Sequence, residues 1–127
     1  MEKLKFQLEY PLKNASRNIL WNSIYAPLGL TEWFADGVTV KGDEFTFSWE
    51  KNELTAYRID AKPNTSVRFQ WEEDEDTEYY FEMEIVSVEV TGDLTLIVTD
   101  FAEPGEQEDL KLLWDKQIDV LRRKTGI

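Results

Sequence analysis

Three runs of alternating apolar and polar residues, followed by one long helical pattern, constrain the fold of this chain most strongly. The apolar members of each run share one parity: Phe45, Phe47 and Trp49; Val67, Phe69 and Trp71; Leu94, Leu96 and Val98. Such alternation is typical of strands with one packed and one solvated face, and it favours an antiparallel sheet over a parallel one. Polar turns at 51–52, 62–64, 74–76 and 91–93 separate the strands.

The N-terminal part predicts a strand and then a helix. Residues 3–10 alternate like the later strands, and Pro11 ends the run. Asn14 or Ser16 can cap a helix over about residues 15–26, because their side-chain oxygens accept hydrogen bonds from free backbone N–H groups.

A break at Pro27 ends that helix, and Thr31 is placed to cap one further turn that carries Trp33 and Phe34. Two short helices are therefore expected after the first strand. The aromatic cluster of Trp21, Trp33 and Phe34 has two interpretations: packing of the short helices over the mouth of a cavity, or an exposed patch for a partner.

Residues 78–90 fit a single strand register less well. Their apolar side chains fall on both parities: Phe81, Met83 and Ile85 on one, Val86, Val88 and Val90 on the other. A bulge near Val86, or burial of both faces, would produce this change of parity.

The segment after residues 104–105 has helical periodicity through about Lys124. Its apolar residues recur at helical spacing: Leu110, Leu113, Trp114, Ile118 and Leu121. Acidic residues in the first turn and basic residues in the last turn both stabilise the helix through its dipole. Gly126 is placed to act as the C-terminal cap.

Length and composition exclude several kinds of chemistry. The chain has 127 residues and is expected to form a single domain over 1–127, with 42% hydrophobic and 13% aromatic residues to build its core. It has no cysteine and no histidine. Disulfides, thiolate zinc sites and cysteine nucleophiles are therefore excluded, and the commonest acid–base side chain is missing. We expect no cofactor, no metal site and no catalytic residues.

The net charge of −12 argues against nucleic acid and anionic membranes as partners, because both need clustered basic residues. The N-terminus lacks the apolar run of a signal peptide, and no segment approaches the ~20 apolar residues of a membrane span. A cytoplasmic protein without membrane insertion is the expectation.

Several segments in this order resemble the START-like (SRPBCC) superfamily, and in particular domains similar to the activator of Hsp90 ATPase. The resemblance rests on Trp21 with Ile24 and Pro27, on residues 30–36, on Gly42 with residues 45–47, and on residues 63–71 and 113–121. It implies an α+β helix-grip fold, in which a curved antiparallel sheet wraps around a long C-terminal helix and two short helices follow the first strand. Members of the superfamily include carriers of apolar ligands, co-chaperone domains, and aromatase and cyclase enzymes.

Such a fold implies a cavity between the sheet and the C-terminal helix. The residues expected to line it come from the apolar faces of both: Trp33, Phe47, Tyr57, Phe69, Trp71, Phe81, Met83, Leu96, Trp114, Gln117, Ile118 and Leu121. The polar groups expected within reach are Tyr57, Arg58, Tyr79 and Gln117. The leading hypothesis is non-enzymatic binding of a small apolar or amphipathic ligand. Alternatively, the large aromatic side chains fill the space themselves.

The acidic run at 72–76, continued by Glu78, supports a second hypothesis. A solvated hairpin tip is the simplest interpretation, and a calcium site is less favoured because EF-hand spacing is missing. The same charges could dock a basic protein partner, which would make the chain a protein-interaction or chaperone-regulating module. An aromatase- or cyclase-like enzyme would require Tyr57, Arg58 or Tyr79 to point into a roomy pocket.

Overall fold

The computed structural model describes residues 2–126 and contains seven strands and three α-helices. In chain order the elements are β1 (Leu4–Leu12), α1 (Arg17–Tyr25), α2 (Pro27–Leu30), β2 (Gly37–Lys41), β3 (Glu44–Trp49), β4 (Asn52–Lys62), β5 (Ser66–Trp71), the 3₁₀ helix η1 (Glu72–Asp74), β6 (Phe81–Ser87), β7 (Leu94–Ala102) and α3 (Gln107–Thr125).

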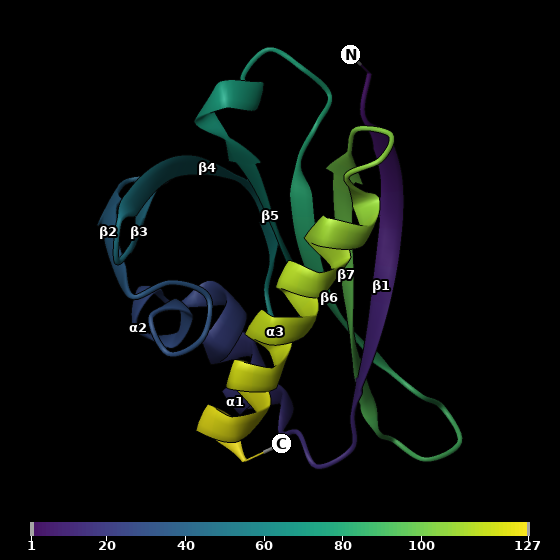
Figure 1. Cartoon of the computed structure of the whole chain (residues 1–127). Helices are drawn as coiled ribbons and strands as arrows, with labels where there is room; N and C mark the ends of the chain where they lie inside the picture. The colour runs from purple at the N-terminus through teal and green to yellow at the C-terminus, as the bar shows by residue number, and fades with distance from the viewer. Residues whose placement is uncertain (1, 127) are drawn as a thin grey trace.

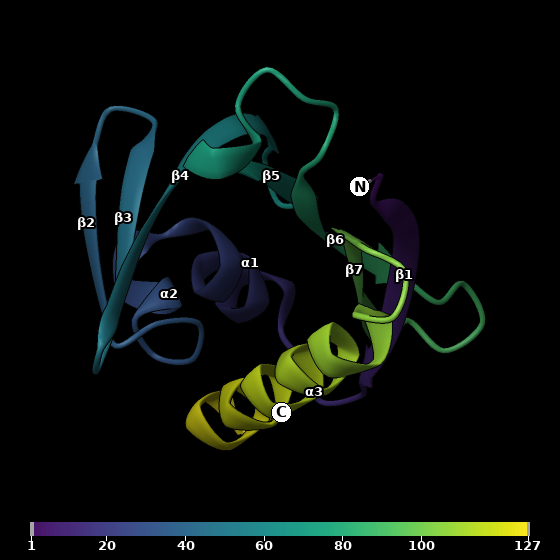
Figure 2. The same cartoon turned by 45° about the horizontal axis from the view of Figure 1, so that its top comes forward.

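The seven strands form one antiparallel sheet in the order β1-β7-β6-β5-β4-β3-β2. The sheet curves strongly, and β2, β3 and β4 arch away from the side that contains β1, β6 and β7 (Figure 1). Helix α3 lies across the open side of this curve, as the rotated view also shows (Figure 2). The expected α+β helix-grip architecture is therefore confirmed.

A β-bulge contributes to the bend of β4. The register between β4 and β5 shifts between Arg58 and Asp60, so that Ile59 has no paired residue and is 50% exposed. Bulges bend the strand that carries them and increase its twist. The bulge therefore lies in the part of the sheet that arches around α3.

The expectation of a bulge near Val86 is wrong, and so is the alternative expectation that both faces of this segment are buried. Strand β6 pairs with β7 without interruption as far as Ser87, where the strand ends. Val86 and Val88 are exposed because the first belongs to the outer face and the second lies in the connection to β7. The apparent change of parity in the sequence therefore comes from valines that are exposed to solvent.

The two short helices are confirmed, but the second begins earlier than expected. The Oγ of Ser16 accepts a hydrogen bond from the backbone N–H of Ile19 and caps α1. Pro27 then starts α2, because its fixed φ suits the first helical position, where an N–H group is not needed. Thr31 lies at the C-terminal end of α2, and residues 31–34 form turns.

Aromatic rings fill the centre of the interior. Phe45, Phe47, Phe69 and Phe81 are all less than 2% exposed. The ring centroids of Phe69 and Phe81 are 5.2 Å apart and stacked, and those of Phe45 and Phe69 are 5.2 Å apart in an edge arrangement. At these separations the rings gain favourable stacking and edge contacts. The centre of the sheet is therefore closed by packing.

Helix α3 covers this centre from Trp114 onwards. Trp114, Ile118 and Leu121 are buried, whereas Leu113 is 52% exposed. Gly126 ends the helix with a φ of 78°, and its N–H donates to the carbonyl of Arg122, as expected for a glycine cap. Nearer the start of α3 the cover is incomplete, because Leu110 is only half-buried and Leu113 is exposed.

Candidate functional site

A cavity of about 280 Å³ lies between the first half of α3 and one end of the concave face of the sheet. Its lining contains four aromatic, three aliphatic and three polar residues: Phe34, Trp49, Trp71 and Trp114; Leu54, Leu110 and Leu113; Asn52, Asp100 and Gln117. This mostly apolar lining with a few convergent polar groups is typical of small-molecule sites.

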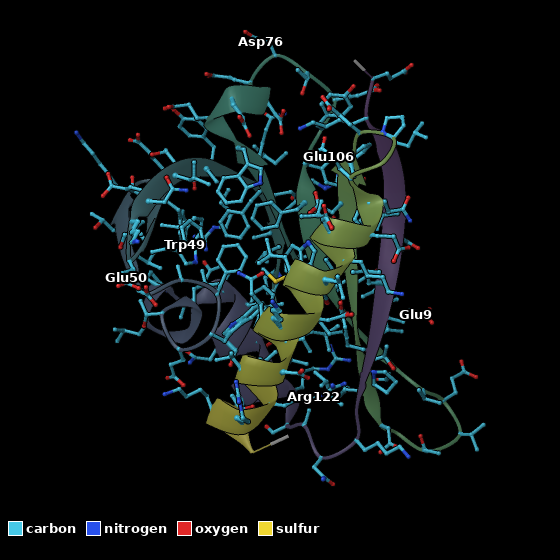
Figure 3. The ribbon with its side chains drawn as sticks, viewed as in Figure 1. Glu9, Trp49, Glu50, Asp76, Glu106 and Arg122 are labelled. Atoms are coloured by element: carbon cyan, nitrogen blue, oxygen red, sulfur yellow. The ribbon has the colours of Figure 1, made fainter. Side chains whose placement is uncertain are left out.

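Strand parity and helical spacing bring these residues together. Trp49 and Trp71 are the last residues of β3 and β5, on the same face as the buried phenylalanines. Figure 3 shows Trp49 on the inside of the arch and its neighbour Glu50 on the outside. From α3, residues 110, 113, 114 and 117 contribute, which is the spacing of one helical face.

The carbonyl of Phe34 holds two lining side chains in place. It accepts a hydrogen bond from Nε1 of Trp49 at 3.1 Å and another from Nε2 of Gln117 at 3.0 Å. The ring of Phe34 packs 5.9 Å from that of Trp114. Residues from the turn after α2, from β3 and from α3 are thus fixed relative to one another, so the cavity is largely preformed.

Asp100 is the charged residue of the cavity and is only 9% exposed. Its Oδ2 accepts a hydrogen bond from Nε1 of Trp114 at 2.8 Å, and its Oδ1 accepts one from the backbone N–H of Phe101 at 2.8 Å. Burial raises the pKa of Asp100 to about 6, although both hydrogen bonds act in the opposite direction. At neutral pH the group therefore carries a negative charge in mostly apolar surroundings.

Sequence reasoning missed Asp100, although a signal was available. Leu94, Leu96 and Val98 share the inward parity of β7, and the same alternation places Asp100 inside. A carboxylate on the core-facing parity of a strand is unusual and therefore informative. The lining residues Asn52 and Leu54 follow the inward parity of β4 in the same way.

Of the twelve residues predicted to line the cavity, Trp71, Trp114 and Gln117 do so. Seven others lie in the packed core with exposures of 0–1%: Phe47, Phe69, Phe81, Met83, Leu96, Ile118 and Leu121. Trp33 is also buried, and its Nε1 donates to the carbonyl of Ser23 at 2.8 Å. Close packing of large side chains thus moves the cavity to the end of the sheet.

The remaining polar residues predicted near the cavity make contacts elsewhere. The hydroxyl of Tyr57 donates to Glu72 at 3.2 Å, and the guanidinium of Arg58 lies 4.2 Å from the ring centroid of Tyr25. The hydroxyl of Tyr79 accepts a hydrogen bond from the backbone N–H of Lys3. None of the three lines the cavity, so the arrangement required for an aromatase- or cyclase-like enzyme is not found there.

The acidic run is not uniformly solvated. Asp74 is 8% exposed, and its Oδ1 lies 3.2 Å from Nζ of Lys3. Asp76 lies at the outer tip of the loop (Figure 3). Within residues 2–126 no cluster of three or more acidic side chains is arranged to hold a metal ion, and no helix in that range could cross a membrane.

Comparison with known proteins defines the family. The profile of the START-like superfamily domain matches residues 1–127, and the chain therefore belongs to the START-like superfamily. A comparison with curated proteins gives no match.

Among solved structures, the solution NMR structure of BfR322 from Bacteroides fragilis is 43% identical, with a TM-score of 0.70 over 100% of this chain and 94% of the other. The Aha1 dimer from Colwellia psychrerythraea is 14% identical, with a TM-score of 0.77 over 93% and 92% of the two chains. The AHSA1-like protein from Aeromonas hydrophila is 13% identical, with a TM-score of 0.74 over 97% and 92%. The last two similarities establish the fold alone.

Proposed function

We propose that this protein binds a small apolar or amphipathic molecule in the cavity between α3 and the end of the sheet, without transforming it. One observation carries the proposal: a preformed, largely aromatic cavity that contains three polar side chains, next to a core whose phenylalanines are fully buried. Binding sites combine apolar area, which supplies affinity, with a few polar groups, which fix orientation.

The volume of about 280 Å³ limits the size of the ligand. It lies just below the usual range of ligand pockets, which starts at about 300 Å³. A substituted single ring or a short branched chain fits this space, whereas a whole phospholipid or a sterol does not. The exposed side chain of Leu113 forms part of the rim and is accessible from solvent.

The experiment is a titration with para-tert-butylbenzyl alcohol, followed by tryptophan fluorescence and by calorimetry. Trp49, Trp71 and Trp114 line the cavity and act as reporters. Leu113→Trp should narrow the entrance and weaken binding about tenfold or more. Leu112→Trp is the matched control, because Leu112 is 56% exposed on the same helix but does not line the cavity. Its affinity should stay within about twofold of the unmodified protein.

A saturable signal that Leu113→Trp removes and Leu112→Trp retains would support the proposal. Equal effects of the two substitutions would place binding outside the cavity. A panel of small neutral aromatic molecules that neither binds nor raises the melting temperature, together with a bare mass in native mass spectrometry of protein from its own host, would overturn the proposal.

A further inference from the structure

We infer that the natural ligand is an organic cation: a protonated or quaternary ammonium group on a small apolar body, bound with its charge against Asp100. The inference rests on the proposed function and specifies the ligand class for the same cavity. It depends on two independent features of the lining. The carboxylate of Asp100 has no cationic partner among the described residues, and the side chains around it are mostly indole rings.

The carboxylate of Asp100 has no cationic partner among the described residues. Its hydrogen-bond donors are an indole N–H and a backbone N–H, both neutral. The neighbouring ammonium of Lys3 lies 3.2 Å and 3.5 Å from the two carboxylate oxygens of Asp74 and pairs with that residue. A carboxylate can accept about four hydrogen bonds, so each Asp100 oxygen retains acceptor capacity. Buried charges are usually paired, because desolvation is costly.

The surrounding side chains suit a cation and disfavour an anion. Three indole rings and one phenyl ring line the cavity, and indole attracts cations most strongly among aromatic side chains at separations of up to about 6 Å. No lysine or arginine is present in the lining. The net charge of −12 also raises the local concentration of cations near the surface.

A purely structural role for Asp100 would be to orient the indole of Trp114 through the 2.8 Å hydrogen bond. An asparagine oxygen could accept that bond at a lower cost of desolvation. A structural role and a ligand-binding role therefore make different predictions for Asp100→Asn. If Asp100 only orients Trp114, the substitution should change the affinity for all ligands equally. If Asp100 binds the charge of the ligand, the substitution should change the affinity for charged ligands alone.

The test compares two molecules of nearly the same shape. Para-(hydroxymethyl)phenyltrimethylammonium differs from para-tert-butylbenzyl alcohol by one nitrogen in place of one carbon and by one positive charge. By calorimetry at about pH 7.5, where Asp100 is ionised, we expect the unmodified protein to bind the cation about tenfold more tightly than the alcohol.

Variants then locate the effect. Asp100→Asn should weaken binding of the cation about tenfold and change binding of the alcohol by less than about twofold. Asp109→Asn is the control, because it removes the same charge from an exposed position on α3, next to the lining residue Leu110. The affinities of this control variant for both molecules should stay within about twofold of those of the unmodified protein.

Equal affinity of the unmodified protein for both molecules, or preference for the alcohol, would overturn the inference while the proposed function stands. Equal loss of both ligands in Asp100→Asn would also overturn it. If neither molecule binds, the inference fails, and the proposed function is then decided by the panel of small neutral aromatic molecules and the native mass. The comparison in the unmodified protein needs no variant, so its outcome does not depend on whether Asp100→Asn folds.

Discussion

The centre of the concave face and its open end are built from the same strands but behave differently. In β3, Phe45 and Phe47 are fully buried, whereas Trp49 is only half-buried. In β5, Phe69 is fully buried and Trp71 is half-buried. All five residues are aromatic and have the same inward parity. Along each strand, a step of two residues therefore leads from a fully packed position to one that lines the cavity.

The difference shows that parity decides which face a side chain occupies, and the opposing helix decides whether that side chain is covered. Ile118 and Leu121 of α3 are completely buried and close the centre. Leu110 and Leu113, nearer the start of α3, are half-buried and exposed, and they face the open end. Closed packing stabilises the fold, and the incompletely covered end forms the cavity.

The largest expected effect compares two residues of β5. Phe69→Ala should lower the free energy of unfolding by about 3–5 kcal/mol, because it empties a fully packed position. Trp71→Ala should cost about half as much, since the side chain is already partly exposed to the cavity. Urea denaturation followed by circular dichroism measures both values. A larger loss for Trp71→Ala would contradict the distinction between centre and open end.

The second prediction concerns the charge at the open end. Because the pKa of Asp100 rises from 3.8 to about 6 on folding, the native state binds the proton more tightly than the unfolded state. The ionised group therefore destabilises the fold by about 3 kcal/mol above about pH 6, and this cost disappears as the pH falls below about 4.

Asp100→Asn removes this pH-dependent cost but keeps only one of the two acceptor oxygens that bind Trp114 and Phe101. The free energy of unfolding of the variant, relative to that of the unmodified protein, should therefore increase as the pH rises from about 4 to about 8. Urea unfolding at a series of pH values measures the difference. Asp109→Asn serves as the control, because it removes one carboxylate from an exposed position on α3. An Asp100→Asn difference that stays constant with pH would contradict the assigned burial of this charge.

The third prediction concerns the hydrogen bonds that hold the cavity wall. Trp49→Phe keeps a ring but removes the 3.1 Å bond from Nε1 to the carbonyl of Phe34. The expected loss is about 1 kcal/mol of unfolding free energy. The Phe34 carbonyl keeps its bond from Gln117, so the rest of the wall should remain in place. Unchanged stability would show that solvent replaces this bond without cost.

The smallest expected effect on stability is at the rim. Leu113→Ser should change the free energy of unfolding by less than about 0.5 kcal/mol, because the side chain is 52% exposed. It should still weaken binding of para-tert-butylbenzyl alcohol several-fold, since apolar contact area is lost. A stability loss comparable to that of Phe69→Ala would show that the rim belongs to the core.

The sequence predicted the general architecture well, because it depends on local periodicity. Alternating runs gave the strands, and the helical stripe with its charged ends and Gly126 gave α3. The second short helix was placed too late because Pro27, read as a stop, is also a good first residue of a helix. The bulge was assigned to β6 instead of β4, because exposed valines imitate a change of parity.

The candidate site was predicted less well. Most of the twelve residues predicted from the sequence came from apolar faces, and seven of them pack in the centre. Asp100 continues the inward parity of β7, but it is a carboxylate, so the apolar periodicity that ends at Val98 does not include it. No local pattern shows where a helix will leave part of a sheet uncovered, so Phe34 and Leu54 could not be placed in the lining.

The sequence by itself determined the inward faces of the alternating runs at 3–10, 45–49, 67–71 and 94–98, the course of the long helix, and the exclusion of cysteine and histidine chemistry. These properties depend on residues that are close together in the sequence and on the amino-acid composition. Only the tertiary structure decided which inward side chains are packed, where the cavity remains, and that Asp100 lacks a cationic partner within the described part of the chain. The physical reason is that the curvature of the sheet and the position of α3 are set by contacts between residues far apart in the sequence, and these contacts determine what is covered.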